Sequence, residues 1–202
     1  MNTALENPRI AALVGSRICH DLISPIGAIN NGMELLAMSG VANSPEMALI
    51  SESVDAANAR IRFFRVAYGT SSENQLLKCS EITSILRDMT RGTRTEVHWE
   101  PAEDLPRDEV QIAFLAIQCA EQAVPYGGRI AMRRIGQMWE ITISSDRFAL
   151  DPTLWGLLTP GSDGHSDVMP AHVQFLLLPE AAKARGRDIS YVTTDTDIRM
   201  TI

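Results

Sequence analysis

The chain has 202 residues, 45% of them hydrophobic, and a formal net charge of -7. This composition predicts a packed core in one large domain or two small ones. The acidic balance argues against nucleic-acid binding and against docking on anionic lipid. The three cysteines form no CxxC pair, so neither a disulfide framework nor a zinc site is expected. Free thiols, the absence of a signal-peptide pattern at the first residues and the absence of a long apolar run together predict a cytoplasmic protein without a membrane segment.

Residues 6–71 predict two helices. In the first, six apolar residues fall within about 40° of one line on a helical wheel: Val14, Ile18, Leu22, Pro25, Ile29 and Leu36. We expect this helix to end near Ser39 and Gly40, because glycine readily adopts the left-handed conformation that closes a helix.

The second helix is expected to begin at Ser44 and Pro45, a capping residue followed by a favoured first helical residue. Its apolar residues alternate three and four apart in a heptad pattern: Met47, Ile50, Val54, Ala57, Ile61, Phe64 and Tyr68. Gly69 marks its end. Two long helices joined by a short loop form an antiparallel hairpin that cannot bury both of its faces. We therefore expect a homodimer in which two hairpins build a four-helix bundle.

The rest of the chain predicts helices packed on a largely antiparallel sheet. We expect helices over 81–91, 108–124 and 171–184, and strands over 93–99, 129–135, 138–144, 188–194 and 197–202. Residues 146–169, rich in Gly, Asp, Ser and Pro, are expected to form a loop. The fold class is thus α+β, with a helical hairpin domain at 1–72 and a sheet-containing domain at 73–202.

The candidate site lies on the first helix, in the stretch His20-Asp21-Leu22-Ile23-Ser24-Pro25. On the helical wheel His20 lies opposite the apolar stripe, so its side chain should face solvent. Pro25 removes one helical hydrogen bond and should bend the helix one turn beyond His20. Small or polar neighbours on the same face would let a partner protein approach the imidazole: Ser16, Ser24, Gly27 and Asn31.

Phosphoryl transfer suits this arrangement. Imidazole is a nucleophile near neutral pH. An adjacent carboxylate, here that of Asp21, can orient the ring, accept its proton or stabilise its charged form. A surface histidine followed by aspartate is nevertheless common on helices, so the pair alone is also compatible with an ordinary solvated face.

The segment ICHDLISPIGAINNGMELL resembles the H-box of the dimerisation and histidine-phosphotransfer domain of sensor kinases, and NARIRFFRVAYG on the second helix is also similar. Within that group, the chain most resembles the alphaproteobacterial histidine phosphotransferase ChpT family. The resemblance implies that His20 is the phosphoacceptor and Asp21 its acid/base neighbour. Ser24 then occupies the position at which kinases with phosphatase activity carry Thr or Asn. Implied partners are the receiver domain of a hybrid histidine kinase and downstream response regulators, with magnesium bound by the receiver.

The second half resembles the ATP-binding domain of those kinases but departs from it at three elements. Leu115 and Cys119 stand where two magnesium-binding asparagines would fall. Asp146 is followed by Arg147-Phe148-Ala149 instead of glycines, and HSDVMPAHVQF replaces a glycine-rich lid. Because backbone must approach phosphate closely at such elements, their loss predicts that the chain binds no ATP and needs no cofactor.

Other interpretations remain open at this stage. The protein could be a receiver-binding scaffold that does not need His20, or a kinase with a remodelled nucleotide site. His165, between Asp163 and Asp167, matches no fixed metal-ligand spacing and is best interpreted as part of a solvated loop. His98 and His172 are expected to be structural. Three arginines of the second helix either form a solvated face or pair with acidic residues of a docking protein: Arg60, Arg62 and Arg65.

Overall fold

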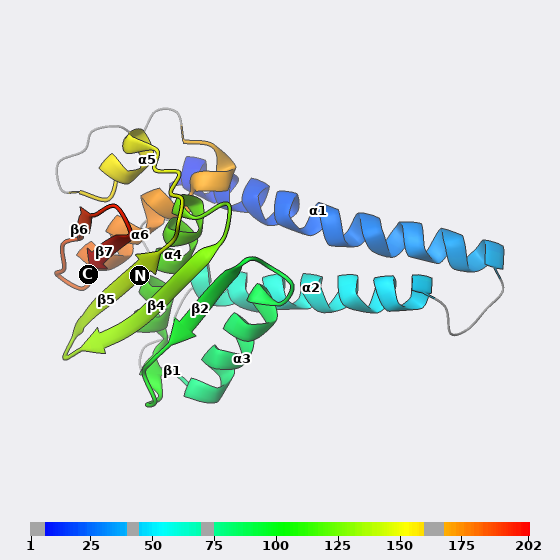
Figure 1. Ribbon diagram of the computed structural model, residues 1–202, viewed down its shortest axis with the longest axis horizontal. Helices are drawn as coiled ribbons and strands as arrows, with labels where there is room; N and C mark the ends of the chain where they lie inside the picture. Colours follow the sequence, from blue (N-terminus) through cyan, green and yellow to red (C-terminus); the bar gives the residue numbers. More distant parts are fainter. Residues whose placement is uncertain (1–6, 40–44, 70–74, 160–167) are drawn as a thin grey trace.

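The computed structural model describes residues 7–39, 45–69, 75–159 and 168–202. Two long helices lie side by side and project from a body made of a sheet and shorter helices (Figure 1). The architecture is α+β, as the sequence predicts.

The hairpin consists of α1 (Pro8–Ser39) and α2 (Pro45–Ala67), close to the expected bounds. The two helices approach closely at Gly32, which is buried. A Cβ atom at this position would lie 2.5 Å from the side chain of Ile50 and 3.3 Å from the carbonyl oxygen of Glu46. A residue without a side chain therefore allows the close contact between the helices.

The main sheet has the order β2-β4-β5-β7-β6. Its strands are β2 (Thr95–Trp99), β4 (Gly128–Ile135), β5 (Met138–Ser144), β6 (Ser190–Thr193) and β7 (Asp197–Thr201). β2 pairs with β4 in parallel and the other neighbours are antiparallel, which confirms the largely antiparallel prediction. The β4–β5 hairpin turns at Gly136, whose φ of 62° is left-handed.

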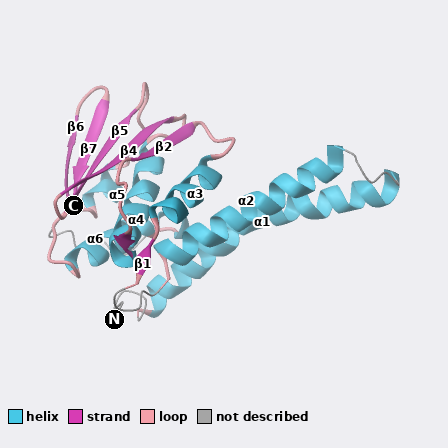
Figure 2. Cartoon of the chain, turned by 90° about the horizontal axis from the view of Figure 1, so that it is seen from below, coloured by secondary structure: helices cyan, strands magenta, loops and turns pink. Residues whose placement is uncertain are grey.

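Helices cover one face of this sheet, as Figure 2 shows. They are α3 (Cys79–Thr90), α4 (Arg107–Ala123) and α6 (Gln174–Lys183). Alternate strand residues are buried beneath them, as the two-residue period of a strand requires: Ile130, Met132, Trp139, Ile141, Ile143, Ile198 and Met200. The core therefore lies between the helices and one face of the sheet.

Three local predictions need correction. The expected loop over 146–169 contains a short helix, α5 (Pro152–Gly156), because Asp151 caps it by accepting hydrogen bonds from the backbone N–H groups of Thr153 and Leu154. The expected helix over 171–184 is divided into a 3₁₀ turn, η2 (Pro170–His172), and α6. A small antiparallel sheet of β1 (Leu76–Leu77) and β3 (Leu105–Pro106) was not predicted, because two-residue strands show no periodicity.

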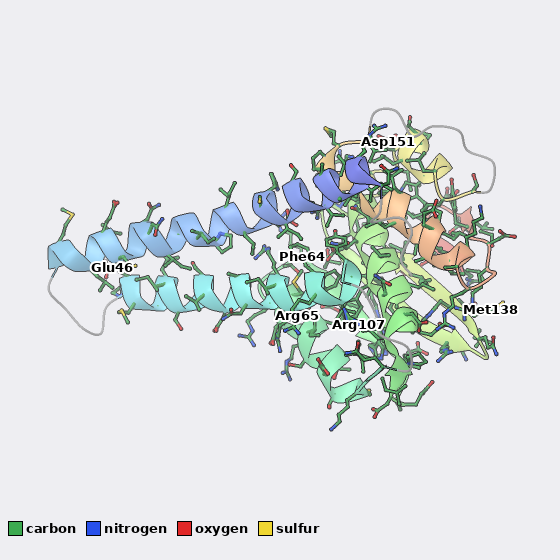
Figure 3. All side chains as sticks on the ribbon, turned by 180° about the vertical axis from the view of Figure 1, so that it is seen from behind. Glu46, Phe64, Arg65, Arg107, Met138 and Asp151 are labelled. Carbon is green, nitrogen blue, oxygen red and sulfur yellow. The ribbon has the colours of Figure 1, made fainter. Side chains whose placement is uncertain are left out.

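The hairpin is fixed to the body where α2 meets α4. The Phe63 ring stacks on that of Phe114, with centroids 4.6 Å apart, and the Tyr68 hydroxyl donates a hydrogen bond of 2.9 Å to Gln118. Figure 3 shows Arg65 and Arg107 at this junction, where the Arg107 guanidinium donates to the carbonyl oxygen of Arg65. One continuous apolar core therefore includes residues of both helices and of the body. The predicted domain boundary at 72–73 lies outside the described residues.

The heptad pattern of α2 divides into two environments. Phe64 and Tyr68, next to the body, are buried within the chain. Met47, Val54 and Ile61 are 43%, 39% and 42% exposed, although they belong to the same pattern. Contacts within one chain therefore bury only the end of the pattern next to the body. The remaining apolar residues form an exposed line along α2.

Candidate functional site

His20 lies on α1 and points away from the hairpin interior. Its side chain is 79% exposed, which agrees with the wheel position opposite the apolar stripe. Val14 and Pro25, members of that stripe, are buried on the other side of the helix. The helix continues through Pro25 to Ser39, so the imidazole is carried by a long helical element.

Asp21 holds the imidazole on one side. The Nδ1 atom of His20 lies 3.0 Å from Oδ1 of Asp21. An ionised carboxylate only accepts hydrogen bonds, so this contact requires the ring proton on Nδ1. The lone pair is then on Nε2, the ring nitrogen that the carboxylate does not contact. A neutral imidazole with this tautomer presents its nucleophilic nitrogen to an incoming group.

Arg17 holds the same carboxylate from the other side. Its Nε atom donates to Oδ2 of Asp21 at 2.7 Å, so both oxygens of Asp21 are engaged. The Nη1 atom of Arg17 donates to the carbonyl oxygen of Ala171 in η2, which lies 154 residues away in the chain. Sequence reasoning missed Arg17. Its spacing of four residues from Asp21 was the available signal, because residues i and i+4 are neighbours on a helix.

The predicted partner-binding residues share the face of His20. Ser16, Ser24 and Asn31 are exposed and Gly27 is partly exposed. A Cβ atom at Gly27 would meet nothing within 4 Å, so the space above this part of α1 is open within the chain. The described structure therefore offers an accessible surface around the imidazole.

Two titratable groups of the body lie within electrostatic reach of Arg17. Burial raises the pKa of Glu121, on α4, to about 7, and the positive charge of Arg17 counteracts part of this rise. Burial also lowers the pKa of His172, and Arg17 lowers it further. The His172 ring packs edge-on against Phe175, with centroids 6.5 Å apart. The charge of Arg17 therefore acts on groups of α4 and η2 as well as on Asp21 of its own helix.

The remaining candidates are placed elsewhere. His98 is exposed on β2, far along the chain from α1, and His165 lies outside the described residues. Arg62 forms an ion pair with Asp88 of α3, so its guanidinium is engaged within the chain. Over the described ranges, no group of three or more His, Cys, Asp and Glu side chains is placed to hold a metal ion.

The residues at the asparagine positions of the kinase pattern are part of the core. Leu115 and Cys119 of α4 are 1% and 0% exposed, and burial raises the pKa of the Cys119 thiol. After β5, the Arg147 guanidinium lies over the Tyr126 ring, 4.2 Å from its centroid. Leu115 and Cys119 therefore contribute to the apolar packing of the core.

Of the helices that the structure describes, none combines the length and the apolar composition needed to cross a membrane.

Comparison with known proteins agrees with this geometry. Residues 79–197 match the family model of the histidine phosphotransferase C-terminal domain. Protein phosphotransferase ChpT of Brucella abortus (strain 2308) is 35% identical over 200 residues, which cover 94% of this chain and 92% of the relative. A solved structure of a bacterial phosphotransferase is 32% identical, covers 96% of both chains and superposes with a TM-score of 0.82. The chain belongs to the histidine phosphotransferase family.

Proposed function

We propose that this protein is a histidine phosphotransferase of a phosphorelay, which accepts a phosphoryl group on His20 from a receiver-domain aspartate and passes it to a second receiver. Family membership supports the reaction class. The observation that carries the proposal is the exposed imidazole of His20, whose Nδ1 atom is held by Asp21. A nucleophile for another protein's phosphoryl group must be both accessible and oriented.

The chemistry follows from the tautomer. The Nε2 lone pair attacks the phosphorus of the aspartyl phosphate, the P–N bond forms, and the P–O bond breaks to release the aspartate carboxylate. The ring keeps its Nδ1 proton and becomes positively charged, and Asp21 stabilises that charge through the 3.0 Å contact. The reverse steps deliver the phosphoryl group to the second receiver. Magnesium would be bound by the receiver, and this chain would contribute no metal ligand.

The partner surface is proposed to be the face of α1 around His20. Ser16, Ser24, Gly27 and Asn31 carry little bulk, so the acidic pocket of a receiver can bring its aspartate within reach of Nε2. Ser24 lies one turn from His20 on the same face. Its hydroxyl can therefore donate a hydrogen bond to a phosphoryl oxygen. A hybrid-kinase receiver and response regulators are the partners that such a surface would serve.

We also propose a homodimer with a four-helix bundle. On α2, the exposed residues Met47, Val54 and Ile61 are seven residues apart. On α1, Cys19, Ile26 and Met33 are likewise exposed and seven residues apart. A seven-residue apolar repeat that remains uncovered on both helices is typical of a helical seam between chains. Because one residue turns the helix by about 100°, His20 lies outside the line through Cys19 and stays accessible.

The sheet-containing unit, 73–202, is proposed to act without nucleotide, beside the hairpin unit, 1–72. Its α4 helix places Leu115 and Cys119 in the core. Buried apolar side chains cannot coordinate a magnesium ion bound to phosphates, since that ion requires oxygen ligands. A partner protein, and not a nucleotide bound to this unit, would therefore supply the phosphoryl group.

Incubation with a radiolabelled, phosphorylated receiver tests the proposal. The native protein should acquire label in a bond that is labile to acid and stable to base, as expected of a phosphoramidate. Label that remains entirely on a receiver in a stable complex would contradict phosphotransfer and favour a scaffold.

A further inference from the structure

Arg17 connects three groups that lie in two parts of the molecule. It donates through Nε to Asp21 on its own helix, and through Nη1 to the carbonyl oxygen of Ala171 in η2. Asp21 in turn contacts Nδ1 of His20. A continuous path of hydrogen bonds therefore runs from the backbone of the sheet-containing part to the imidazole.

This arginine is unsuited to docking a partner. Its side chain is 13% exposed and that of Asp21 is 18% exposed, whereas the side chain of His20 is 79% exposed. The planar guanidinium presents donors in fixed directions, so binding Ala171 restricts the direction in which Nε points at Asp21. Arg17 is thus placed to orient the carboxylate rather than to contact a receiver.

The hydrogen bond to Ala171 holds Arg17 against η2. The charge of Arg17 also acts on Glu121 of α4 and on His172 of η2. The α2–α4 contact of Phe63 with Phe114 fixes the hairpin against the same body. Movement of η2 relative to α1 would therefore be transmitted to Asp21 through Arg17.

We propose that Arg17 is a positioning residue through which the sheet-containing part of the chain sets the tautomer and orientation of His20. This inference rests on the proposed phosphoacceptor role of His20. On this proposal the sheet-containing part of the chain contributes to phosphoryl transfer by orienting His20, without binding a nucleotide. The carbonyl of Ala171 fixes Arg17, Arg17 fixes Asp21, and Asp21 keeps the proton on Nδ1, so that Nε2 remains the nucleophile.

The test compares Arg17→Met with Arg91→Met in the full chain. Both changes remove one side of an ion pair and keep a long apolar side chain, but Arg91 pairs with Asp88 of α3, outside the path from Ala171 to His20. Two quantities are measured: the single-turnover rate of phosphoryl transfer from a phosphorylated receiver at saturating receiver, and the tautomer of His20 from its ¹⁵N chemical shifts at a pH where the ring is neutral. Circular dichroism and thermal unfolding establish that each variant is folded.

Arg17→Met should lower the transfer rate by about 10–100-fold and shift the ring toward the Nε2–H tautomer, because a misoriented nucleophile loses that order of rate. Arg91→Met should change neither quantity. Arg17→Lys keeps the charge but cannot donate in both directions with one planar group, so it should restore the rate only in part. If Arg17→Met is folded and retains both the native rate and the native tautomer, the proposal is wrong.

A double-mutant cycle with Asp21→Asn shows whether Arg17 acts through Asp21. The two losses should not multiply, because both variants break the same path. Fully multiplicative losses would contradict the proposed path. His20→Ala separates this question from the proposed function: a native-like rate in His20→Ala contradicts the phosphoacceptor role itself, whereas an inactive His20→Ala beside a fully active Arg17→Met contradicts only the role of Arg17.

Discussion

The Nδ1 atom of His20 lies 3.0 Å from Oδ1 of Asp21, while Oδ2 of the same carboxylate accepts a hydrogen bond of 2.7 Å from Arg17. Asp21 is therefore fixed at both oxygens and can hold the imidazole in one orientation. The exposed side of the ring is left for a reaction partner.

Asp21→Asn should slow phosphoryl transfer by about 100-fold without abolishing it, in line with the usual contribution of a positioned proton-handling group. The imidazole remains the nucleophile, but an amide can donate to Nδ1 and thereby favour the proton on Nε2. The measurement is the single-turnover rate of label transfer from a phosphorylated receiver. Asp55→Asn, an exposed carboxylate on α2, is the matched control and should transfer at the native rate. Equal rates for Asp21→Asn and the native protein would show that Asp21 is not needed for orientation.

The dimer prediction concerns Ile61, which is 42% exposed on α2. Ile61→Asp should convert the dimer to a folded monomer, because it places a charge in the seam between chains but not in the core of one chain. Leu49→Glu, at a similarly exposed apolar position on another face of α2, should remain dimeric. Multi-angle light scattering gives the mass of each species, and a folded monomer for the native chain would contradict the bundle.

Phe64 should respond differently from Ile61, although both belong to the heptad pattern. Phe64 is 5% exposed and stacks against Tyr68 with ring centroids 5.3 Å apart. A charge at this position is buried within one chain, so Phe64→Asp should unfold the protein and not merely dissociate it. Far-ultraviolet circular dichroism distinguishes the two results, and a folded monomeric Phe64→Asp would show that the residue acts between chains.

Glu121 predicts a pH dependence of stability. Burial raises its pKa in the folded protein from 4.5 to about 7, so between these values the folded protein retains a proton that the unfolded chain has released. The free energy of unfolding should therefore fall as pH rises through this window, by at most about 3 kcal/mol. Arg17 and Arg60 oppose the rise in pKa, and Asp21 adds to it.

Glu121→Gln removes this titration. The variant should match the native protein near pH 4 and be more stable than it near pH 8, as measured by urea unfolding across the range. Glu34→Gln, an exposed carboxylate on α1, is the control and should follow the native curve. The lowered pKa of His172 has the opposite effect on stability and is present in both proteins, so the difference between Glu121→Gln and the native protein is the quantity that decides. A difference in the free energy of unfolding that stays constant from pH 4 to pH 8 would contradict the raised pKa.

The nucleotide prediction depends on α4. Because Leu115 and Cys119 are buried in the core, we expect no heat of binding when magnesium-ATP is titrated into the protein in a calorimeter. Binding in the micromolar range would instead indicate a remodelled nucleotide site and favour autokinase activity over relay.

Periodicity in the sequence predicted the elements well, since it reflects burial directly. The position of His20 followed from the spacing of Ile18, Leu22 and Ile29, and the turn at Gly136 from its flanking strands. The heptad pattern of α2 was less decisive. It identified Phe64 and Ile61 as apolar positions, but spacing does not show whether an apolar residue packs within a chain or between two chains.

The missed features depend on contacts between distant segments. Arg17 donates to the backbone carbonyl of Ala171, 154 residues away. Every residue has a backbone carbonyl, so the sequence does not indicate which one a distant side chain contacts. The cap of α5 was visible as Asp151 followed by Pro152, yet the abundance of turn-forming residues around it favoured a loop. The site was thus predictable on its own helix, whereas its connection to the rest of the molecule was not.

The most direct test of the account is label transfer from a phosphorylated receiver to His20→Ala. Since His20 is 79% exposed and alanine is the best helix former, the variant should keep its fold and its oligomeric state. The native protein should acquire acid-labile, base-stable label, and His20→Ala should acquire none. Undiminished labelling of a folded His20→Ala would contradict the central claim that His20 carries the phosphoryl group.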